Sequence, residues 1–330
     1  MQSVTVRAPA KVNLQLAVGP RREDGYHDLV NVFHAVSVFD EVSATPATKL
    51  RITVEGEAAA SVPTGETNLA VKAARALAAV TRTDGVVPSG GRRSVGLQPR
   101  VHLHIKKGIP VAGGMAGGSA DAAAALVACD ALWGTELWDT RAGRDSIMEI
   151  AADLGADVPF ALLGGTAVGV GKGDHLSMAL ARGTYHWVFA LADGGLSTPA
   201  VYAECDRLRG DQADAPKPTV SPALMAALSA GDPIALGAAL ANDLQPAAIR
   251  LRPQLRRTLD AGREHGALGA IVSGSGPTCA FLAADVEHMY DIAVALSAMG
   301  VCRAVRTATG PAPGARIVTS DAASGSTSRT

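Results

Sequence analysis

The first hundred residues alternate between apolar and polar side chains. Successive side chains of a strand point to opposite faces, so this alternation predicts strands with one buried face. The predicted strands cover residues 4–6, 12–16, 36–42, 50–54 and 101–105. A helical pattern interrupts them at residues 68–80, where Thr67 or Asn68 is placed to cap the first turn.

The pattern changes beyond about residue 165, where strands and helices are interspersed. Strands are predicted at residues 166–170, 187–191, 270–272 and 279–282, and helices at residues 222–228, 233–241, 253–264 and 286–299. Because no βαβ unit repeats, the sequence predicts an α+β fold, with domains at residues 1–165 and 166–310. Residues 311–330 are rich in Pro, Ser, Thr and Ala, and are predicted to form a disordered tail.

Charge and composition indicate a globular protein and argue against a nucleic-acid-binding or membrane-spanning one. Lys and Arg number 30 against 31 Asp and Glu, a net charge of −1, so no broad basic surface for nucleic acid is expected. Hydrophobic residues make up 48% of the chain, enough for a sizeable core. The four cysteines form no C-x-x-C pair and are expected to be reduced. With no signal peptide or membrane span evident, the expected location is the cytoplasm.

A dense glycine run separates the strand at residues 101–105 from an alanine-rich helix predicted to begin near Ser119. Glycine lets backbone N–H groups approach an anion closely, and a helix N-terminus adds a positive dipole. The run therefore predicts a phosphate cradle, although it matches neither the Walker A pattern nor G-x-G-x-x-G. The alternative is a plain turn in which Ser119 or Asp121 caps the helix. The candidate cradle consists of Pro110, Val111, Ala112, Gly113, Gly114, Met115, Ala116, Gly117, Gly118, Ser119 and Ala120.

Lys11 and Asn13 stand two residues apart in a predicted strand and therefore project from the same face. That face would otherwise continue into the core, so two polar groups on it predict a polar site. The alternative is an edge strand with a solvated lysine.

Two further segments carry candidate chemistry, each with a plainer alternative. Asp157 is the carboxylate of the otherwise apolar segment 155–160, and is either a base or the cap of the next helix. Residues 273–278 follow a predicted strand as a second glycine loop. Within it, Gly274, Ser275 and Gly276 would let a backbone or a phosphate come close, unless the segment is simply a turn.

Taken in this order, the four segments resemble the motifs of the GHMP kinase superfamily. The matching patterns are A-P-A-K-x-N at residues 8–13, a P-x-x-x-G-x-x-G-G-S-like loop at 110–119 and S-G-S-G-P-T at 273–278. The resemblance extends from Ala8 to Ala283. It implies an N-terminal, ATP-binding domain like domain 2 of ribosomal protein S5, and a ferredoxin-like C-terminal domain.

Within the superfamily, residues 25–29 (G-Y-H-D-L) and 155–160 resemble one branch. That branch uses ATP to phosphorylate the 2-hydroxyl of a cytidine-diphosphate-linked methylerythritol, on the methylerythritol phosphate route to isoprenoid precursors. The resemblance implies that residues 110–120 hold the ATP phosphates, and that Asp157 takes the hydroxyl proton with Lys11 beside it. Mg²⁺ is implied as a second cofactor. Ser119 is a candidate ligand for metal or phosphate, and the other metal ligands are left unknown.

The same resemblance assigns residues to two ligand pockets. The substrate side comprises Asn13, Tyr26, His27, Phe33, Thr198 and Tyr202, and the adenine side Asn68 and Lys107. His27 is expected to read the cytosine edge, while the aromatic rings stack on the base. Tyr202 stands where some relatives carry phenylalanine, a change that preserves stacking. The alternatives are that Phe33 is a core residue, His27 a turn histidine bonded to backbone, and Asn68 only a helix cap.

Other interpretations of the chain stay open. Another superfamily kinase, acting on homoserine or mevalonate, would need no base-reading turn. An RNA-binding protein built on an S5-like domain is disfavoured by the near-zero charge. His102 and His104 share a strand face without a third ligand nearby, so they predict strand surface rather than a metal site. The expected partners are small molecules, without nucleic acid or membrane, and the expected state is a monomer or weak homodimer.

Overall fold

The computed structural model describes residues 3–81, 98–111, 113–210 and 217–318. A long hairpin of β1 (Val4–Arg21) and β2 (His27–Pro46) forms the centre of an eight-stranded sheet, in which part of the strand order is β12-β1-β2-β4-β3. The strand β5 pairs with β2, β6 with β5, and β8 runs parallel to β1. The remaining strands of this sheet are β3 (Arg51–Gly56), β4 (Val101–Lys107), β5 (Thr166–Gly171), β6 (His175–Met178), β8 (Ala241–Asn242) and β12 (Arg316–Ile317).

The strands predicted at residues 4–6 and 12–16 are parts of the single strand β1. Its register against β2 shifts between Pro9 and Ala10, and again between Asn13 and Gln15. Such irregularities bend a strand and change the direction of its side chains. Lys11 and Asn13 lie between the two shifts, in the stretch of β1 that passes the candidate site.

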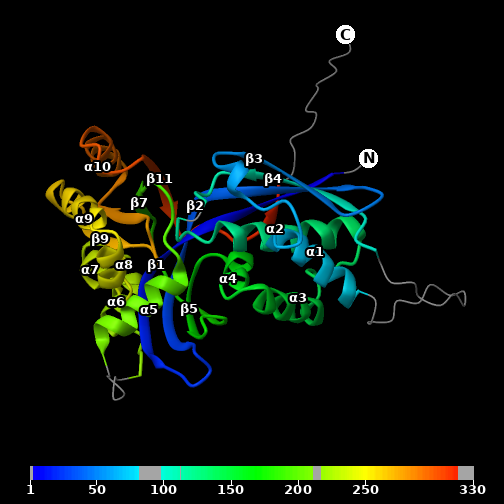
Figure 1. Cartoon of the computed structure of the whole chain (residues 1–330), viewed down its shortest axis with the longest axis horizontal. Helices are drawn as coiled ribbons and strands as arrows, with labels where there is room; N and C mark the ends of the chain where they lie inside the picture. Colours follow the sequence, from blue (N-terminus) through cyan, green and yellow to red (C-terminus); the bar gives the residue numbers. More distant parts are fainter. Residues whose placement is uncertain (1–2, 82–97, 112, 211–216, 319–330) are drawn as a thin grey trace, which may run out of the picture.

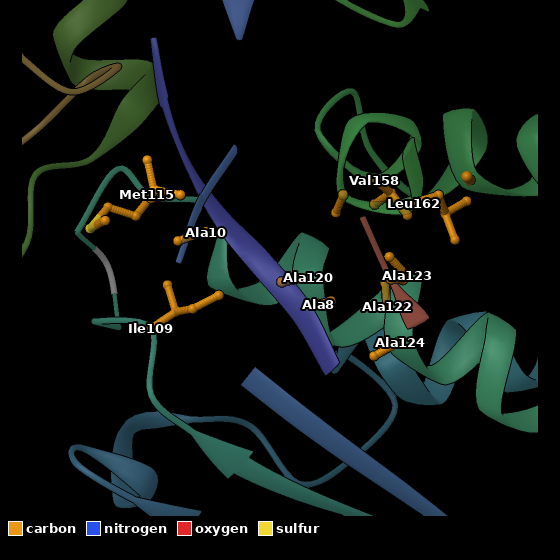
Figure 2. Packing of buried hydrophobic residues seen from close by; sticks show 14 of the residues in the cluster. Ala8, Ala10, Ile109, Met115, Ala120, Ala122, Ala123, Ala124, Val158 and Leu162 are labelled. Atoms are coloured by element: carbon orange, nitrogen blue, oxygen red, sulfur yellow. The ribbon is translucent and has the colours of Figure 1, made fainter. Parts of the chain in front are cut away.

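Four helices accompany the first sheet, and α2 is the most deeply buried of them. They are α1 (Leu69–Val80), α2 (Gly117–Trp133), α3 (Arg141–Leu154) and α4 (Val158–Leu163), with a short 3₁₀ turn, η1 (Ala59–Ser61), after β3. Every residue of α2 from Ala120 to Asp130 is buried. Because many of its buried side chains are alanine, α2 packs closely against β1, β2 and α1. Figure 2 shows Ala120 of α2 beside Ala8 and Ala10 of β1.

The second sheet is antiparallel, with the order β11-β7-β10-β9. Its strands are β7 (Tyr185–Leu191), β9 (Gly269–Val272), β10 (Cys279–Ala283) and β11 (Ala304–Gly310). The helices of this half are α5 (Thr198–Arg209), α6 (Pro222–Ala230), α7 (Pro233–Ala239), α8 (Gln245–Leu251), α9 (Gln254–Glu264) and α10 (Val286–Ala298) (Figure 1). Helices follow β7 and β10, which gives the β-α-β-β-α-β order of a ferredoxin-like domain. The predicted two-domain α+β fold is confirmed.

Most predicted elements are present, and the misses concentrate in the second half. The helix at residues 68–80 begins at Leu69, and Asn68 caps it by accepting a hydrogen bond from the Ala70 N–H (2.8 Å). The helices α5 and α8 and the strands β6 and β11 were not predicted from the sequence. Only Val201 and Cys205 of α5 are buried, so the apolar periodicity that marks a helix is weak there.

The predicted domain division stays a prediction, and strand pairing suggests two changes to it. β5 and β6 pair within the first sheet, so residues 166–178 belong with the N-terminal half. The predicted tail is ordered at its start: Ala312 and Ala315 are buried, and β12 pairs with β1 through Val6 and Ile317. Backbone pairing, which composition does not reveal, holds these residues in place. We propose that the boundary between the two domains lies between Met178 and Tyr185. The rest of the predicted tail, residues 319–330, and the segment 82–97 lie outside the described residues.

Two expectations drawn from composition can be compared with the structure. The four cysteines (Cys129, Cys205, Cys279 and Cys302) form no disulfide, as expected. Within the described ranges, no helix is long and apolar enough to cross a membrane.

Candidate active site

Two cavities meet at the predicted phosphate cradle. The first cavity has a volume of about 330 Å³ and lies between η1, the start of α1 and the residues that follow β4. The second cavity, of about 380 Å³, lies between β1, β2, α5 and the second glycine loop. Gly114 and Ala116 line both cavities. A ligand in one cavity can therefore approach a ligand in the other across these two residues.

The two glycine loops are packed against each other. Gly114 has a φ of +74°, and a side chain there would overlap the carbonyl oxygen of Ser273. The Ser273 hydroxyl donates a hydrogen bond to the Gly114 carbonyl (3.1 Å). A Cβ at Gly113 would lie 2.9 Å from Thr278 Oγ1. Glycine is required here both for the backbone conformation and for this close approach.

The cradle leads directly into α2. Ala116 precedes the helix in the left-handed conformation, with a φ of +62°, and its side chain makes no capping hydrogen bond. The first N–H groups of a helix have no partner within the helix, and the helix dipole is positive at this end. Gly117 and Gly118, which supply these groups, line the first cavity and carry no side chain to shield them. This arrangement is suited to binding an anion.

The cradle residues fall into three groups: those that line the first cavity, one that lines the second cavity, and those buried in the core. Those lining the first cavity are Pro110, Val111, Gly113, Gly114, Ala116, Gly117 and Gly118. Ser119 lines the second cavity instead. Met115 and Ala120 are buried in the core, so their side chains cannot contact a ligand (Figure 2). Ala112 lies outside the described residues.

Lys107 lies at the bottom of the first cavity, buried between two carboxylates. Its Nζ donates hydrogen bonds to Asp40 Oδ2 and to Asp121 Oδ2 (2.8 Å for the latter). Asp40 also accepts from the N–H groups of Gly108 (2.7 Å) and Ile109 (2.8 Å). Asp40 was not predicted from the sequence, and Asp121 was considered only as a cap. The available signal was a lone carboxylate among alanines for Asp121, and a carboxylate beside Glu41 in an otherwise apolar strand for Asp40.

The buried charges alter one another's protonation. Burial lowers the pKa of Lys107, but Asp121 and Asp40 outweigh it, so its pKa is raised overall. Burial, followed by the nearby Asp40 charge, raises the pKa of Asp121 to about 7, against the opposing effect of Lys107. Asp121 Oδ1 has no hydrogen-bond partner among the described residues, and Asp121 lines the first cavity.

Asn68, predicted for the adenine side, both caps α1 and lines the first cavity. Its Nδ2 donates to the Pro63 carbonyl (2.7 Å) while its Oδ1 caps the helix. Both alternatives considered for this residue are therefore compatible with its position.

Lys11 and Asp157 come together in the second cavity. Lys11 Nζ lies 3.8 Å from Asp157 Oδ2 and donates to Asn13 Oδ1 (2.6 Å). Asn13 in turn donates to Asn31 Oδ1 (2.6 Å), a residue not predicted from the sequence. Asp157 precedes α4 without capping it, and its side chain is 31% exposed. Its carboxylate is therefore held at the cavity wall with access to a ligand.

The second glycine loop closes this wall. A Cβ at Gly274, where φ is +57°, would lie 3.2 Å from Asn13 Oδ1 and 3.4 Å from Lys11 Nζ. Asn242 holds the loop by donating to the carbonyls of Val272 and Gly274. Ser275 lines the cavity and is hydrogen-bonded to Thr198 (2.9 Å between the hydroxyl oxygens). Gly276 does not line it.

Tyr202 and Phe33 both line the second cavity. Phe33 is 1% exposed and stacks on Phe160 (5.0 Å between centroids), so it is a core residue with one edge at the cavity. Tyr202 stacks with His27 (5.3 Å). Burial, with a smaller effect from Asp157, raises the pKa of Tyr202 to about 12, which keeps its hydroxyl protonated.

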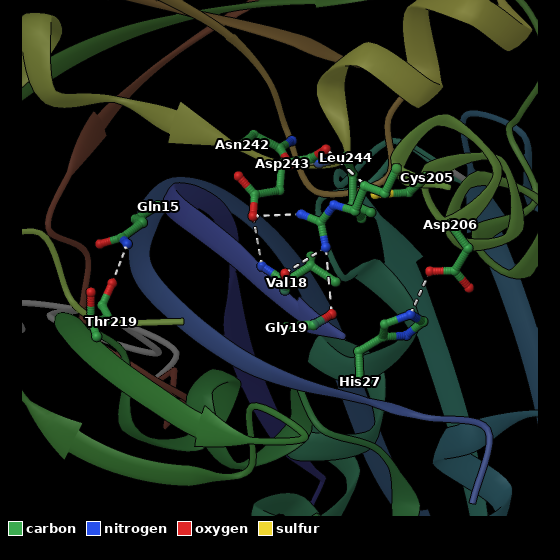
Figure 3. A network of polar contacts seen from close by, with 11 residues as sticks. Gln15, Val18, Gly19, His27, Cys205, Asp206, Thr219, Asn242, Asp243 and Leu244 are labelled. Atoms are coloured by element: carbon green, nitrogen blue, oxygen red, sulfur yellow. Dashed lines mark hydrogen bonds and ion pairs between the residues drawn. The ribbon is translucent and has the colours of Figure 1, made fainter. Parts of the chain in front are cut away.

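His27 and Tyr26 lie beside the cavity rather than in its wall. His27 Nε2 is 2.8 Å from Asp206 Oδ1 of α5, a side-chain partner in place of the backbone partner considered above (Figure 3). Tyr26 is 57% exposed, and its ring lies 4.2 Å from Lys172 Nζ. Asp206 and Lys172 were not named from the sequence, because their positions depend on the packing of α5 and of the β5–β6 turn.

The described residues contain no group of three or more His, Cys, Asp or Glu side chains that could hold a metal ion. His102 and His104 both contact the Thr53 hydroxyl on the neighbouring strand β3 (2.8 and 2.9 Å). Both side chains therefore lie at the surface of the sheet beside Thr53.

Comparison with known proteins identifies the family of this chain. Residues 68–165 match the GHMP kinases N terminal domain, and residues 224–302 match the GHMP kinases C terminal domain. The chain belongs to the GHMP kinase family. The predicted family membership is thereby confirmed, and the family's kinases use ATP as the phosphoryl donor.

Individual relatives define the branch of the GHMP kinase family. The chain is 58% identical to the 4-diphosphocytidyl-2-C-methyl-D-erythritol kinase of Streptomyces avermitilis, over 96% of this chain and 100% of that one. It is 57% identical to the enzyme of that name from Thermobifida fusca, over 96% and 98%. A crystal structure of 4-(cytidine 5'-diphospho)-2C-methyl-D-erythritol kinase superposes with a TM-score of 0.70 at 31% identity, over 92% and 98%. This GHMP kinase therefore falls in that branch.

The structures of homoserine kinase and mevalonate kinase also resemble this GHMP kinase. Homoserine kinase from Cytophaga hutchinsonii has a TM-score of 0.68 at 18% identity, covering 96% of this chain and 98% of its own. L. major mevalonate kinase has a TM-score of 0.68 at 16% identity, covering 93% of this chain and 96% of its own. At such identities the likeness shows the fold alone.

Proposed function

We propose that this GHMP kinase transfers the γ-phosphoryl group of ATP to the 2-hydroxyl of 4-diphosphocytidyl-2-C-methyl-D-erythritol, in the methylerythritol phosphate route to isoprenoid precursors. The observation that carries the proposal is the Lys11–Asp157 pair, which stands in the second cavity where it meets the first cavity at Gly114. A nucleotide whose phosphates lie at the cradle would direct its terminal phosphoryl group toward that pair.

Asp157 is the base of the proposed reaction. Its partly exposed carboxylate accepts the proton of the 2-hydroxyl as the oxygen attacks phosphorus. Lys11, held by Asn13, stabilises the charge that develops on the attacking oxygen. Phosphoryl transfer passes through a loose transition state, so positioning and charge neutralisation supply most of the rate and a modest base suffices.

The nucleotide is bound mainly by backbone. N–H groups at Gly117 and Gly118 receive the phosphates, with Lys107 Nζ beside Gly117, and the adenine end lies toward Asn68. Mg²⁺ would be held by the nucleotide's phosphates and the Ser119 hydroxyl. Mg²⁺ takes most of its ligands from phosphates and water, so a group of three or more acidic side chains, which the described residues do not contain, is not required. When bound, it neutralises charge on the β- and γ-phosphates.

The cytidine of the acceptor substrate lies against Tyr202, with Phe33 at the cavity wall and His27 and Tyr26 at its edge. Thr198 and Asn13 face the sugar-alcohol end. The monomeric or weakly dimeric state and the absence of a nucleic-acid partner stay predictions.

A coupled assay of ADP release tests the proposal. Purified protein with ATP, Mg²⁺ and 4-diphosphocytidyl-2-C-methyl-D-erythritol should release ADP, and ³¹P NMR should show a new phosphomonoester. CMP should compete with the acceptor, because it occupies the same base site. Turnover of homoserine or mevalonate that CMP does not inhibit would contradict the proposal. It would favour a GHMP kinase that acts on homoserine or mevalonate.

A further inference from the structure

A cluster of three charged side chains joins the two halves of the molecule. Glu57 follows β3 of the first sheet, whereas Arg303 precedes β11 of the second sheet and Arg306 lies within it. Arg303 Nη1 donates a hydrogen bond to Glu57 Oε1, and Arg306 Nη2 donates to Glu57 Oε2 (2.7 Å for the latter). Each carboxylate oxygen of Glu57 is thus bound by a different arginine. These three residues form the Glu57 cluster.

Glu57 begins a segment, residues 57–63, that forms one wall of the first cavity. Ser61 and Pro63 of this segment line that cavity. None of residues 57–63, all of them described by the structure, is buried, so core packing does not fix the wall. At the far end of the segment, Asn68 Nδ2 donates to the Pro63 carbonyl (2.7 Å). The position of the wall therefore depends on how its two ends are held.

The strand β11, which carries the arginines, is anchored independently of Glu57. It pairs with β7 along its length. The Thr309 N–H donates to the Ser37 hydroxyl of β2 (2.8 Å), and a Cβ at Gly310 would overlap the His34 ring of the same strand. The arginines therefore project from a strand that other contacts fix against β2, and they can hold Glu57 in place.

The Glu57 cluster also adjoins the phosphate cradle. A small cavity of about 170 Å³ is lined by the three residues of the cluster and by residues 107–111. Lys107, Pro110 and Val111 line the first cavity as well. The cluster is therefore separated from the first cavity by the segment that leads from β4 into the cradle.

We propose that Glu57 is a positioning residue for the nucleotide, an inference that rests on the proposed function because it places ATP in the first cavity. By binding Arg303 and Arg306, Glu57 holds the wall formed by residues 57–63 against the nucleotide. A single exposed ion pair contributes little, but here two arginines fix one carboxylate. Loss of these contacts lets the wall move and weakens nucleotide binding, while the Lys11–Asp157 pair is left unchanged.

Nucleotide binding by Glu57→Gln tests this inference, because the variant keeps the size of the side chain and removes its charge. Titration with a fluorescent ATP analogue should show a Kd about 3- to 10-fold higher, the loss of two exposed charge-assisted contacts, and KM for ATP should rise equally. Both kcat and KM for the acceptor should stay within about twofold of wild type. Glu149→Gln, which removes an exposed carboxylate of α3, is the matched control and should resemble the wild type.

The direction of the effect separates positioning from simple electrostatics. Removing a negative charge near a bound anion would by itself strengthen ATP binding. Unchanged or tighter binding by Glu57→Gln would therefore overturn the inference. So would a loss of kcat in parallel with a lower Tm, since Glu57 would then act only on stability. A wild type that loses ATP affinity on Glu57→Gln but never phosphorylates the acceptor would contradict only the proposed function.

Substitution of the arginines provides a second test. The double variant Arg303→Gln with Arg306→Gln should also weaken ATP binding, and adding Glu57→Gln to it should change the Kd by less than about twofold. Residues that act through the same contacts are not additive. A triple variant in which the separate losses multiply would overturn the inference, because Glu57 would then act independently of the arginines.

Discussion

The two cavities are lined by different kinds of groups, although they share Gly114 and Ala116. The first cavity is lined in part by glycine backbone, and its charged groups, Lys107 and Asp121, are buried and hydrogen-bonded to each other. The second cavity is walled by side chains whose functional atoms reach the ligand space, such as the Asp157 carboxylate. Substitutions in the first cavity are therefore expected to affect both folding and nucleotide binding, whereas single side chains of the second cavity are expected to be replaceable without unfolding the protein.

The largest effect should come from Asp157→Asn. Removing the proposed base should lower kcat by about 10²- to 10⁴-fold, because proton transfer to a positioned base contributes that much. The affinity for ATP and the Tm should change little, since Asp157 caps no helix and lies outside the first cavity. Steady-state kinetics with a fluorescent-nucleotide titration measures both. Asp153→Asn, an exposed carboxylate of α3, is the control; near-normal turnover of Asp157→Asn would assign the base elsewhere.

Unlike Asp157→Asn, the variant Gly114→Ala should lower both the stability of the protein and its affinity for the nucleotide. A non-glycine residue at positive φ costs about 1–3 kcal/mol, and the new Cβ would also overlap the Ser273 carbonyl. Chemical denaturation should record a loss of at least that size, and KM for ATP should rise. Gly65→Ala is the matched control, because a Cβ there meets nothing within 4 Å. A Gly114→Ala protein as stable as Gly65→Ala would contradict the packing of the two glycine loops.

Substitutions of Tyr202 test how far acceptor binding in the second cavity depends on a single side chain. Tyr202→Ala should raise KM for the acceptor by about 10-fold or more, because stacking on one base contributes about 1–3 kcal/mol. Tyr202→Phe keeps the ring and should stay within about threefold of wild type. Initial rates at varied acceptor concentration distinguish the two. Equal losses in both variants would mean that the hydroxyl, rather than the ring, makes the contact.

The smallest effect concerns pH and the first cavity. The pKa of Asp121 is about 7 in the folded protein, above its ordinary value of 3.8, so the folded state retains a proton that the unfolded state releases. The contribution of Asp121 to stability is therefore present below pH 4 and weakens as the pH rises to about 7. Asp121→Asn removes this dependence. Thermal melts from pH 5 to 8 should show wild type losing Tm relative to the variant as pH rises, and a constant difference would contradict the raised pKa.

The sequence alone singled out both glycine loops, the Lys11–Asn13 face and Asp157 as candidates, and their roles stay predictions. Each of these depends on local rules: glycine spacing, the alternation of a strand, and an isolated carboxylate in an apolar segment. The resemblance to the GHMP kinases, confirmed by the comparisons, added the acceptor substrate. The pairing of β5 with β2 and of β12 with β1 could not be predicted, because strand partners far apart in sequence leave no periodic signal.

Sequence by itself thus determined which chemical groups this kinase has, and the order in which the chain presents them. Tertiary structure decided which groups meet. Asp40 joins Lys107 across 67 positions of sequence, Asp206 reaches His27 across 179, and the β5–β6 turn places Lys172 over Tyr26. Such contacts depend on the packing of whole helices and strands. No pattern among residues close together in the sequence indicates them.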